Sequence, residues 1–349
     1  MANNNYEQRH LETLDRDLGR FSNLERATSY ATRPFMGLGV SLIFIILAGF
    51  IAFYLFGNTG STVVIVIAAG LGAYMALNIG ANDVANNMGP AVGANALTMG
   101  GAIAIAAIFE SAGALLAGGD VVSTVAKGII APESMETASI FIWAMLAALL
   151  SAALWVNLAT WIGAPVSTTH SVVGGVMGAG IAAAGFAAVN WPTMYKIAAS
   201  WVISPVLGGA VAALFLWFIK TQIVYRSDKI AAARKWVPFL VGIMGGAFAV
   251  YLSLKGLRKV MKIDFSTALM IGFGIGLLIW FVMVPVIRKQ SEGLENRNKS
   301  LKKLFGIPLV VSAALLSFAH GANDVANAVG PLAAIVQAST SGAFIDAVS

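Results

Sequence analysis

The amino-acid sequence predicts an all-α polytopic membrane protein, because of its composition and its long apolar segments. Hydrophobic residues make up 58% of the 349 positions and charged residues 11%, whereas a soluble domain carries about 25% charged residues. The chain has no cysteine, which excludes disulfides, thiolate metal sites and cysteine nucleophiles. Nine segments approach the roughly 20 apolar residues that a helix needs to cross a bilayer, at residues 37–56, 60–80, 97–117, 139–162, 171–189, 197–219, 236–254, 266–287 and 305–322.

The charged residues are concentrated outside these segments. Residues 1–36 form a polar tail, and three basic loops follow at residues 220–235, 255–265 and 288–304. If every apolar segment crosses the membrane, the tail and the first and third loops lie on one side, which carries most of the lysines and arginines. Positive residues stay in the cytoplasm, so we expect the N-terminus to be cytoplasmic. The net charge of +6 then needs no nucleic-acid partner.

One motif occurs twice in the chain. Residues 80–90 read GANDVANNMGP and residues 321–331 read GANDVANAVGP, so nine of eleven positions are identical. The predicted number of crossings between the copies is odd, which turns the second copy upside down relative to the first. Pro90 and Pro331, together with the neighbouring glycines, predict that each motif unwinds its helix. Inverted repeats with interrupted helices near the midplane are typical of secondary transporters, and the sequence predicts this architecture.

The motif places carboxylates at membrane depth, in the residues Asp83 and Asp324. Such groups are costly in a bilayer and mark an ion or substrate path. The amide oxygens beside them are hard ligands that suit Na⁺, and they belong to Asn82, Asn86, Asn323 and Asn327. Glu110, within the apolar stretch AAIFESAGALL, is expected to join this set. The alternative is that these polar groups only hydrogen-bond between helices.

A third polar stretch, GAPVSTTHS at residues 163–171, separates two apolar segments. Hydroxyls and amides that begin a helix after a proline form a favourable anion site, which predicts such a site at Ser167, Thr168 and Thr169. An ordinary N-cap at a tight turn is the alternative. His170 and His320 could carry protons, although we favour histidines that are hydrogen-bonded in a polar pocket.

The charges at membrane depth decide between possible solutes. The predicted site holds three carboxylates and neither lysine nor arginine, so it repels a bare anion. The STTH stretch nevertheless suits an oxyanion. Both features are accommodated if the anion enters only together with cations that neutralise the carboxylates. The sequence therefore predicts cation-coupled anion symport.

The duplicated GANDVAN, the IFE segment and PVSTTH resemble the inorganic phosphate transporter family of sodium- or proton-coupled symporters. The resemblance extends over about residues 60–349. It implies two inverted repeats, a homodimer, and phosphate bound where the motifs meet near the middle of the membrane. It assigns substrate binding to Asp83, Asp324, Ser167, Thr168 and Thr169. Cation binding is assigned to Asn82, Asn86, Glu110, Asn323 and Asn327.

Four regions are expected along the chain. They are a cytoplasmic tail at 1–36, an extra helix with the first transport repeat at 37–219, connecting helices with basic loops at 220–304, and the start of a second repeat at 305–349. In the first copy 80 residues lead from Pro90 to His170, whereas eighteen residues follow Pro331, so the second copy lacks a counterpart to PVSTTH. We therefore expect a C-terminally shortened member of the family that does not transport alone.

Two other functions compete with phosphate symport. A sulfate permease of the same family would bind a similar dianion, but phosphate can donate a hydrogen bond to an acceptor such as Asp83 and sulfate cannot. A membrane enzyme acting on a phosphorylated substrate would need a nucleophile with an adjacent base or a metal motif such as HExxH, and the sequence has neither arrangement. We expect no enzymatic activity, no cofactor beyond coupling Na⁺ or H⁺, and a location in the cytoplasmic (inner) membrane.

Overall fold

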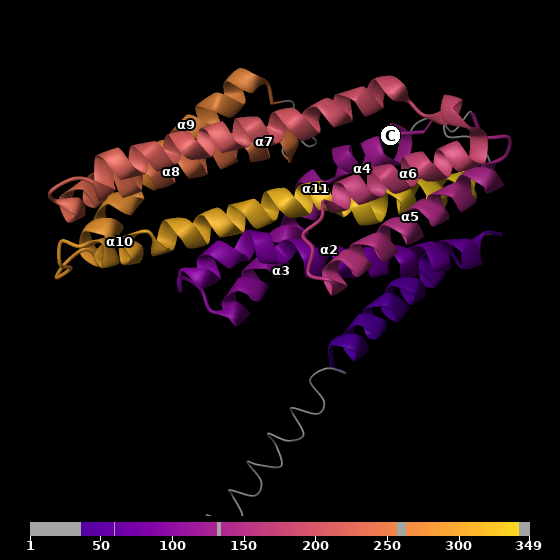
Figure 1. Ribbon diagram of the computed structural model, residues 1–349, viewed down its shortest axis with the longest axis horizontal. Helices are drawn as coiled ribbons and strands as arrows, with labels where there is room; N and C mark the ends of the chain where they lie inside the picture. Colours follow the sequence, from indigo (N-terminus) through magenta and orange to yellow (C-terminus); the bar gives the residue numbers. More distant parts are fainter. Residues whose placement is uncertain (1–35, 59, 131–133, 257–262, 342–349) are drawn as a thin grey trace, which may run out of the picture.

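The computed structural model describes residues 36–58, 60–130, 134–256 and 263–341 (Figure 1). Expectations for the 1–36 tail, apart from its last residue, lie outside the described residues. Eight described helices are long and apolar enough to cross a membrane, which agrees with a multi-pass membrane protein. They are Met36–Phe56, α2 (Thr62–Gly93), α3 (Met99–Ala117), α5 (Ala138–Trp161), α7 (Trp191–Ile219, continued by η3, Lys220–Val224), α8 (Lys229–Lys255), α9 (Phe265–Gln290) and α11 (Gly306–Ser341).

The remaining described elements are shorter. They are α4 (Gly119–Lys127), α6 (Thr168–Ala184), η2 (Phe186–Ala188) and α10 (Asn298–Leu304). The predicted crossing at 171–189 corresponds to α6, which has 17 residues and is followed by a single turn of η2. Other predicted crossings are longer than expected, because α2 and α11 both continue through their copies of the motif.

The prediction that the motifs unwind their helices was wrong. Pro90 and Pro331 lie inside continuous helices, since a proline removes only one backbone hydrogen bond and the rest of the ladder can persist. The interruptions occur in the partner helices instead. α3 gives way to α4 at Gly118, and residues 162–167 separate α5 from α6. The loop at 162–167 contains Gly163, whose φ of +72° strongly favours a residue without a side chain.

α2 and α11 pack against each other in opposite directions (Figure 1). Gly72, in the first half of α2, lies against Ala328 and Leu332, in the second half of α11. An apolar cluster likewise joins Ile65, near the start of α2, to Val336, near the end of α11. The two copies of the motif therefore run antiparallel, as an inverted repeat requires.

α3 approaches α11 backbone to backbone. A Cβ atom built on Gly321 would lie 2.6 Å from the Cα of Glu110, and one built on Gly113 would lie 2.9 Å from the carbonyl carbon of Phe318. Any larger residue at either position would push the helices apart. These small residues let α3 bring Glu110 beside the second motif, in the close packing that is common between membrane helices.

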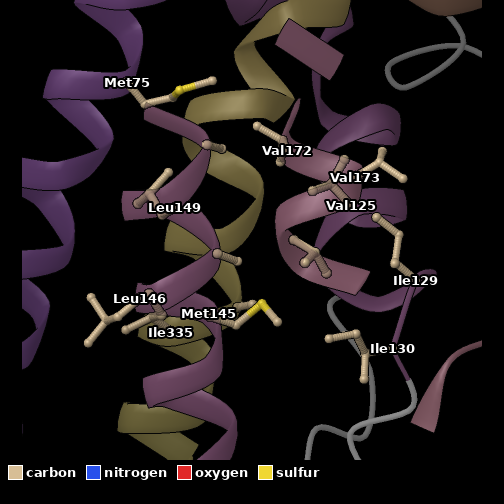
Figure 2. Close-up of a cluster of buried hydrophobic side chains, with 14 of the residues drawn as sticks. Met75, Val125, Ile129, Ile130, Met145, Leu146, Leu149, Val172, Val173 and Ile335 are labelled. Carbon is tan, nitrogen blue, oxygen red and sulfur yellow. The ribbon is translucent and has the colours of Figure 1, made fainter. Parts of the chain in front are cut away.

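The largest buried cluster holds the motif helices against the α5–α6 pair. Met75 of α2, Leu149 of α5, Val172 of α6 and Ile335 of α11 belong to it, and Val125 joins it from α4. Figure 2 shows these side chains between the helices. A second cluster packs α8 against α9 and α10. The first cluster fixes the position of α6 relative to both motifs, and so positions the site described below.

The first and third basic loops lie at the same end of the molecule, as the count of membrane crossings predicts. The amide of Lys229 donates to Asn296 Oδ1 at 2.9 Å, and Asn296 Nδ2 donates to the carbonyl of Ser227 at 2.7 Å. These bonds join the turn before α8 to the turn before α10. That this end faces the cytoplasm stays a prediction.

Candidate substrate and cation site

The break between α5 and α6 is held in place by the first copy of the motif. Asn82 Nδ2 donates to Thr160 Oγ1 at 2.9 Å and to the carbonyl of Ala164 at 3.4 Å, and its Oδ1 accepts from the amide of Val166 at 3.4 Å. Asn82 thus replaces the hydrogen bonds that the loop lost when the helix ended. Its role here is to position the start of α6.

α6 begins at Thr168, where the prolyl segment predicted a helix start. Ser167 is the N-cap and accepts the amide of His170 at 3.2 Å. A serine in this position satisfies one of the amides that lack a partner inside the helix. The first turn of α6 points its hydroxyls toward both copies of the motif.

Thr168 joins the two motif carboxylates. Its Oγ1 lies 2.9 Å from Asp83 Oδ2 and 3.1 Å from Asp324 Oδ2. Asn327 Nδ2 donates to this oxygen at 3.2 Å and to Thr169 Oγ1 at 3.1 Å. The hydroxyl of Thr168 has one proton, so it can donate to one carboxylate at a time. Residues that are far apart in the sequence therefore meet at a single oxygen.

His320, which directly precedes the second motif, lies among three carboxylates. Its Nε2 is 2.9 Å from Asp324 Oδ2 and 3.8 Å from Asp83 Oδ2, and its Nδ1 is 3.3 Å from Glu110 Oε1. Asn87 donates to the same Glu110 oxygen at 3.2 Å. This arrangement agrees with a histidine in a polar pocket. His170, in contrast, packs on Trp201, with ring centroids 3.9 Å apart.

These groups surround a polar cavity of about 280 Å³. Seven of the ten predicted site residues line it, namely Asp83, Asn86, Ser167, Thr168, Thr169, Asn323 and Asp324. The other three do not: Asn82 and Asn327 hold α6 in place, and Glu110 contacts His320. Two further residues line it, namely Asn87, which was not predicted, and His320, which was predicted only as a histidine in a polar pocket. The position of His320 four residues before Asp324, one helical turn away, is the signal that could have assigned it to the site.

The electrostatics of this cavity favour a cation. Ligand atoms of Asp83, His320 and Asp324 all lie within 4.8 Å of one another. Two carboxylates at that distance repel each other by about 3 kcal/mol at an effective dielectric constant of about 20. Among the described residues, no lysine or arginine lines the cavity. The oxygen-rich donor set suits a hard cation such as Na⁺, and the hydroxyls of α6 suit an oxyanion.

Comparison with known proteins gives a family match. The sequence pattern of the phosphate transporter family matches residues 79–347, which include both motifs and the PVSTTH segment. The chain belongs to the phosphate transporter family. This membership confirms the resemblance that the duplicated motif indicated.

Individual members of the family are similar over most of the chain. A "Putative phosphate permease" of Helicobacter pylori (strain J99) is 50% identical over 322 residues, which are 92% of this chain and 60% of that protein. One of Thermococcus kodakarensis is 37% identical over 279 residues, covering 80% of this chain and 67% of its own length. A solved structure, named "The sodium-dependent phosphate transporter", matches with a TM-score of 0.77 at 35% identity, covering 82% of this chain and 70% of that one. The chain thus spans about three fifths of the length of the Helicobacter relative.

Proposed function

We propose that the protein carries inorganic phosphate across the membrane together with a cation, Na⁺ or H⁺. The observation that carries this proposal is the meeting of Asp83 and Asp324 at the hydroxyl of Thr168, at the start of α6. Two antiparallel copies of one motif thereby bring acidic groups to a polar cavity inside the membrane-spanning part. The family and the names of its members support phosphate as the solute.

Phosphate would be held by the start of α6. The hydroxyls of Ser167, Thr168 and Thr169 line the cavity, and a helix N-terminus presents amides and the positive end of its dipole. A protonated phosphate can also donate a hydrogen bond to Asp83 or Asp324. We assign these five residues to substrate binding.

The cation would neutralise the motif carboxylates and so admit the anion. Of the five residues that the sequence suggested, we assign the cation to the side-chain oxygens of Asn86, Glu110 and Asn323, because Asn82 and Asn327 hold α6 in place. Among these, Asn86 and Asn323 line the cavity. Without the cation, phosphate meets two negative groups at close range, so phosphate binding depends on cation binding. The name of the solved relative, a sodium-dependent transporter, supports Na⁺ as the coupling ion.

Uptake of labelled phosphate into proteoliposomes tests the proposal, measured on the full-length protein because residues 1–349 span about three fifths of the length of the Helicobacter relative. Replacing sodium by choline at fixed pH should abolish uptake if Na⁺ couples, whereas collapse of a proton gradient should abolish it if H⁺ couples. Asp324→Asn should reduce uptake at least tenfold, while Glu292→Gln, in an exposed loop, should leave it unchanged. Uptake that ignores both cations, or that survives Asp324→Asn, contradicts symport. Excess sulfate should not compete, and full competition would favour a sulfate permease.

Three further assignments stay predictions. We propose a homodimer, a location in the cytoplasmic (inner) membrane, and a cytoplasmic N-terminus, the last from the distribution of basic residues. Labelling of a cysteine introduced at Lys289, in the last turn of α9, tests the orientation. If this end is cytoplasmic, the cysteine is labelled only after the membrane is made permeable. The label reports this position alone, because the chain contains no other cysteine.

A further inference from the structure

A second cavity lies far along α11 from the motif, where α10 meets the turn between α2 and α3. It has a volume of about 440 Å³ and is lined by Lys299, Lys302 and Lys303 and by residues 94–96. All three lysines are exposed. Within the described ranges, none of them forms an ion pair with a carboxylate. Three uncompensated positive charges around one cavity form a favourable site for an anion.

An apolar cavity adjoins the basic one. It has a volume of about 490 Å³ and is lined by α7, α8 and α11, with Phe215, Leu240 and Met244 among its walls. Phe305 and Leu309 line both cavities. A ligand that occupies the two together therefore needs an anionic end and an apolar end. Inorganic phosphate would fill only the first of them.

The neighbouring side chains place this end of the molecule at the boundary between membrane and water. Trp236 packs edge-on against Phe218, with centroids 5.0 Å apart, and the ammonium group of Lys235 lies 5.0 Å from the Trp236 ring centroid. Tryptophan and basic residues gather at the level of the lipid headgroups. The lysines of α10 and the apolar cavity thus lie at the depths of a headgroup and of acyl chains.

We propose that the two cavities together bind one anionic phospholipid, with its headgroup phosphate at Lys299, Lys302 and Lys303 and an acyl chain between α7, α8 and α11. Basic pockets between membrane helices recognise anionic headgroups in this way. A zwitterionic lipid would bind more weakly, because the positive group of its headgroup is repelled by the lysines. The site is separate from the motif cavity, so the proposal does not depend on the transported solute.

Binding of phosphatidylglycerol and phosphatidylcholine to the purified protein in detergent, measured by native mass spectrometry, tests the headgroup. We expect preferential binding of phosphatidylglycerol. The triple variant Lys299→Gln, Lys302→Gln, Lys303→Gln should weaken it by up to about a hundredfold, from three charge contacts. A control triple, Lys220→Gln, Lys229→Gln, Lys289→Gln, removes the same charge from the same end of the molecule and should change binding little. Equal binding of both lipids, or an equal loss in both triples, overturns the proposal.

A cavity-filling variant tests the acyl chain. Met244→Trp should block phosphatidylglycerol, whereas Met270→Trp, on the exposed face of α9, should not. If Met244→Trp binds the lipid normally and inorganic phosphate displaces it, the basic cavity takes a free anion and the lipid proposal is wrong. The thermal unfolding midpoint without lipid shows whether each variant is folded, and Leu240→Phe offers a smaller filling change if Met244→Trp is not.

Discussion

Gly80 and Gly321 hold the same position in the two copies of the motif but meet different surroundings. Gly80 is exposed, and a Cβ atom built on it would find nothing within 4 Å. On Gly321 the same atom would lie 2.6 Å from the Cα of Glu110. An ordinary contact begins at 3.4 Å, and the carbonyl oxygen of Glu110 is nearer still than its Cα, so Gly321→Ala must separate α3 from α11 by at least about 0.8 Å. Backbone atoms cannot rotate away, so the strain cannot be relieved locally.

The two alanine variants should therefore differ in stability. Either change gains up to about 1 kcal/mol of helix propensity, and this gain cancels when the variants are compared. Overpacking costs about 1–3 kcal/mol, and we expect the upper end at Gly321 because the contact is with backbone. The thermal unfolding midpoint of Gly321→Ala should fall several degrees below that of Gly80→Ala. Its phosphate uptake should also fall, because the shift disturbs the contact between Glu110 and His320. Equal midpoints and equal uptake would refute the close contact between α3 and α11.

Three other changes test the site itself. Thr168→Val should reduce phosphate uptake at least tenfold by leaving the motif carboxylates without their shared hydroxyl, and Thr168→Ser should restore most of it. His320→Gln should reduce uptake, because it removes the imidazole between three carboxylates, whereas His170→Gln should retain uptake near the wild-type level. Asp83→Asn should flatten the dependence of uptake on cation concentration more than Asp324→Asn does, because Asp324 already has His320 beside it. In each pair, indistinguishable initial rates over a range of sodium concentrations would contradict the assigned role.

The convergence of Asp83 and Asp324 could be predicted from the sequence, because carboxylates in membrane-spanning segments are tolerated only where other polar groups lie beside them. The start of α6 at Thr168 was also predictable from Pro165 and the hydroxyls after it. The location of the helix breaks was not. Proline and glycine mark positions where a helix can end. At Pro90, however, the backbone hydrogen bonds of α2 continue, whereas α5 has already ended before Pro165. Tertiary contacts decide between these outcomes, and sequence spacing does not report them.

The role of individual polar residues was harder to predict than their location. Asn82 and Asn86 belong to the same motif and differ little as sequence signals. Only the structure shows that Asn82 faces the loop at 162–167, while Asn86 lines the cavity. An asparagine has both donors and an acceptor, so it can hold a loop or bind an ion equally well. Which it does depends on the groups that the fold brings beside it.

The repeat supplies two identical acids but leaves them in different surroundings. Asp324 has the Nε2 of His320 at 2.9 Å and the side-chain amide of Asn323 at 2.9 Å. Asp83 is 3.8 Å from the same imidazole, and the position corresponding to His320 in the first copy is Ile79. Thr168 can donate its single proton to Asp83, 2.9 Å away, but this one hydroxyl is set against the two nitrogen groups beside Asp324. The less compensated negative charge is therefore on Asp83, and the cation proposed for symport would gain most close to it, where Asn86 also lines the cavity. The departure from symmetry at positions 79 and 320 would thus give the proposed cation a preferred side of the site.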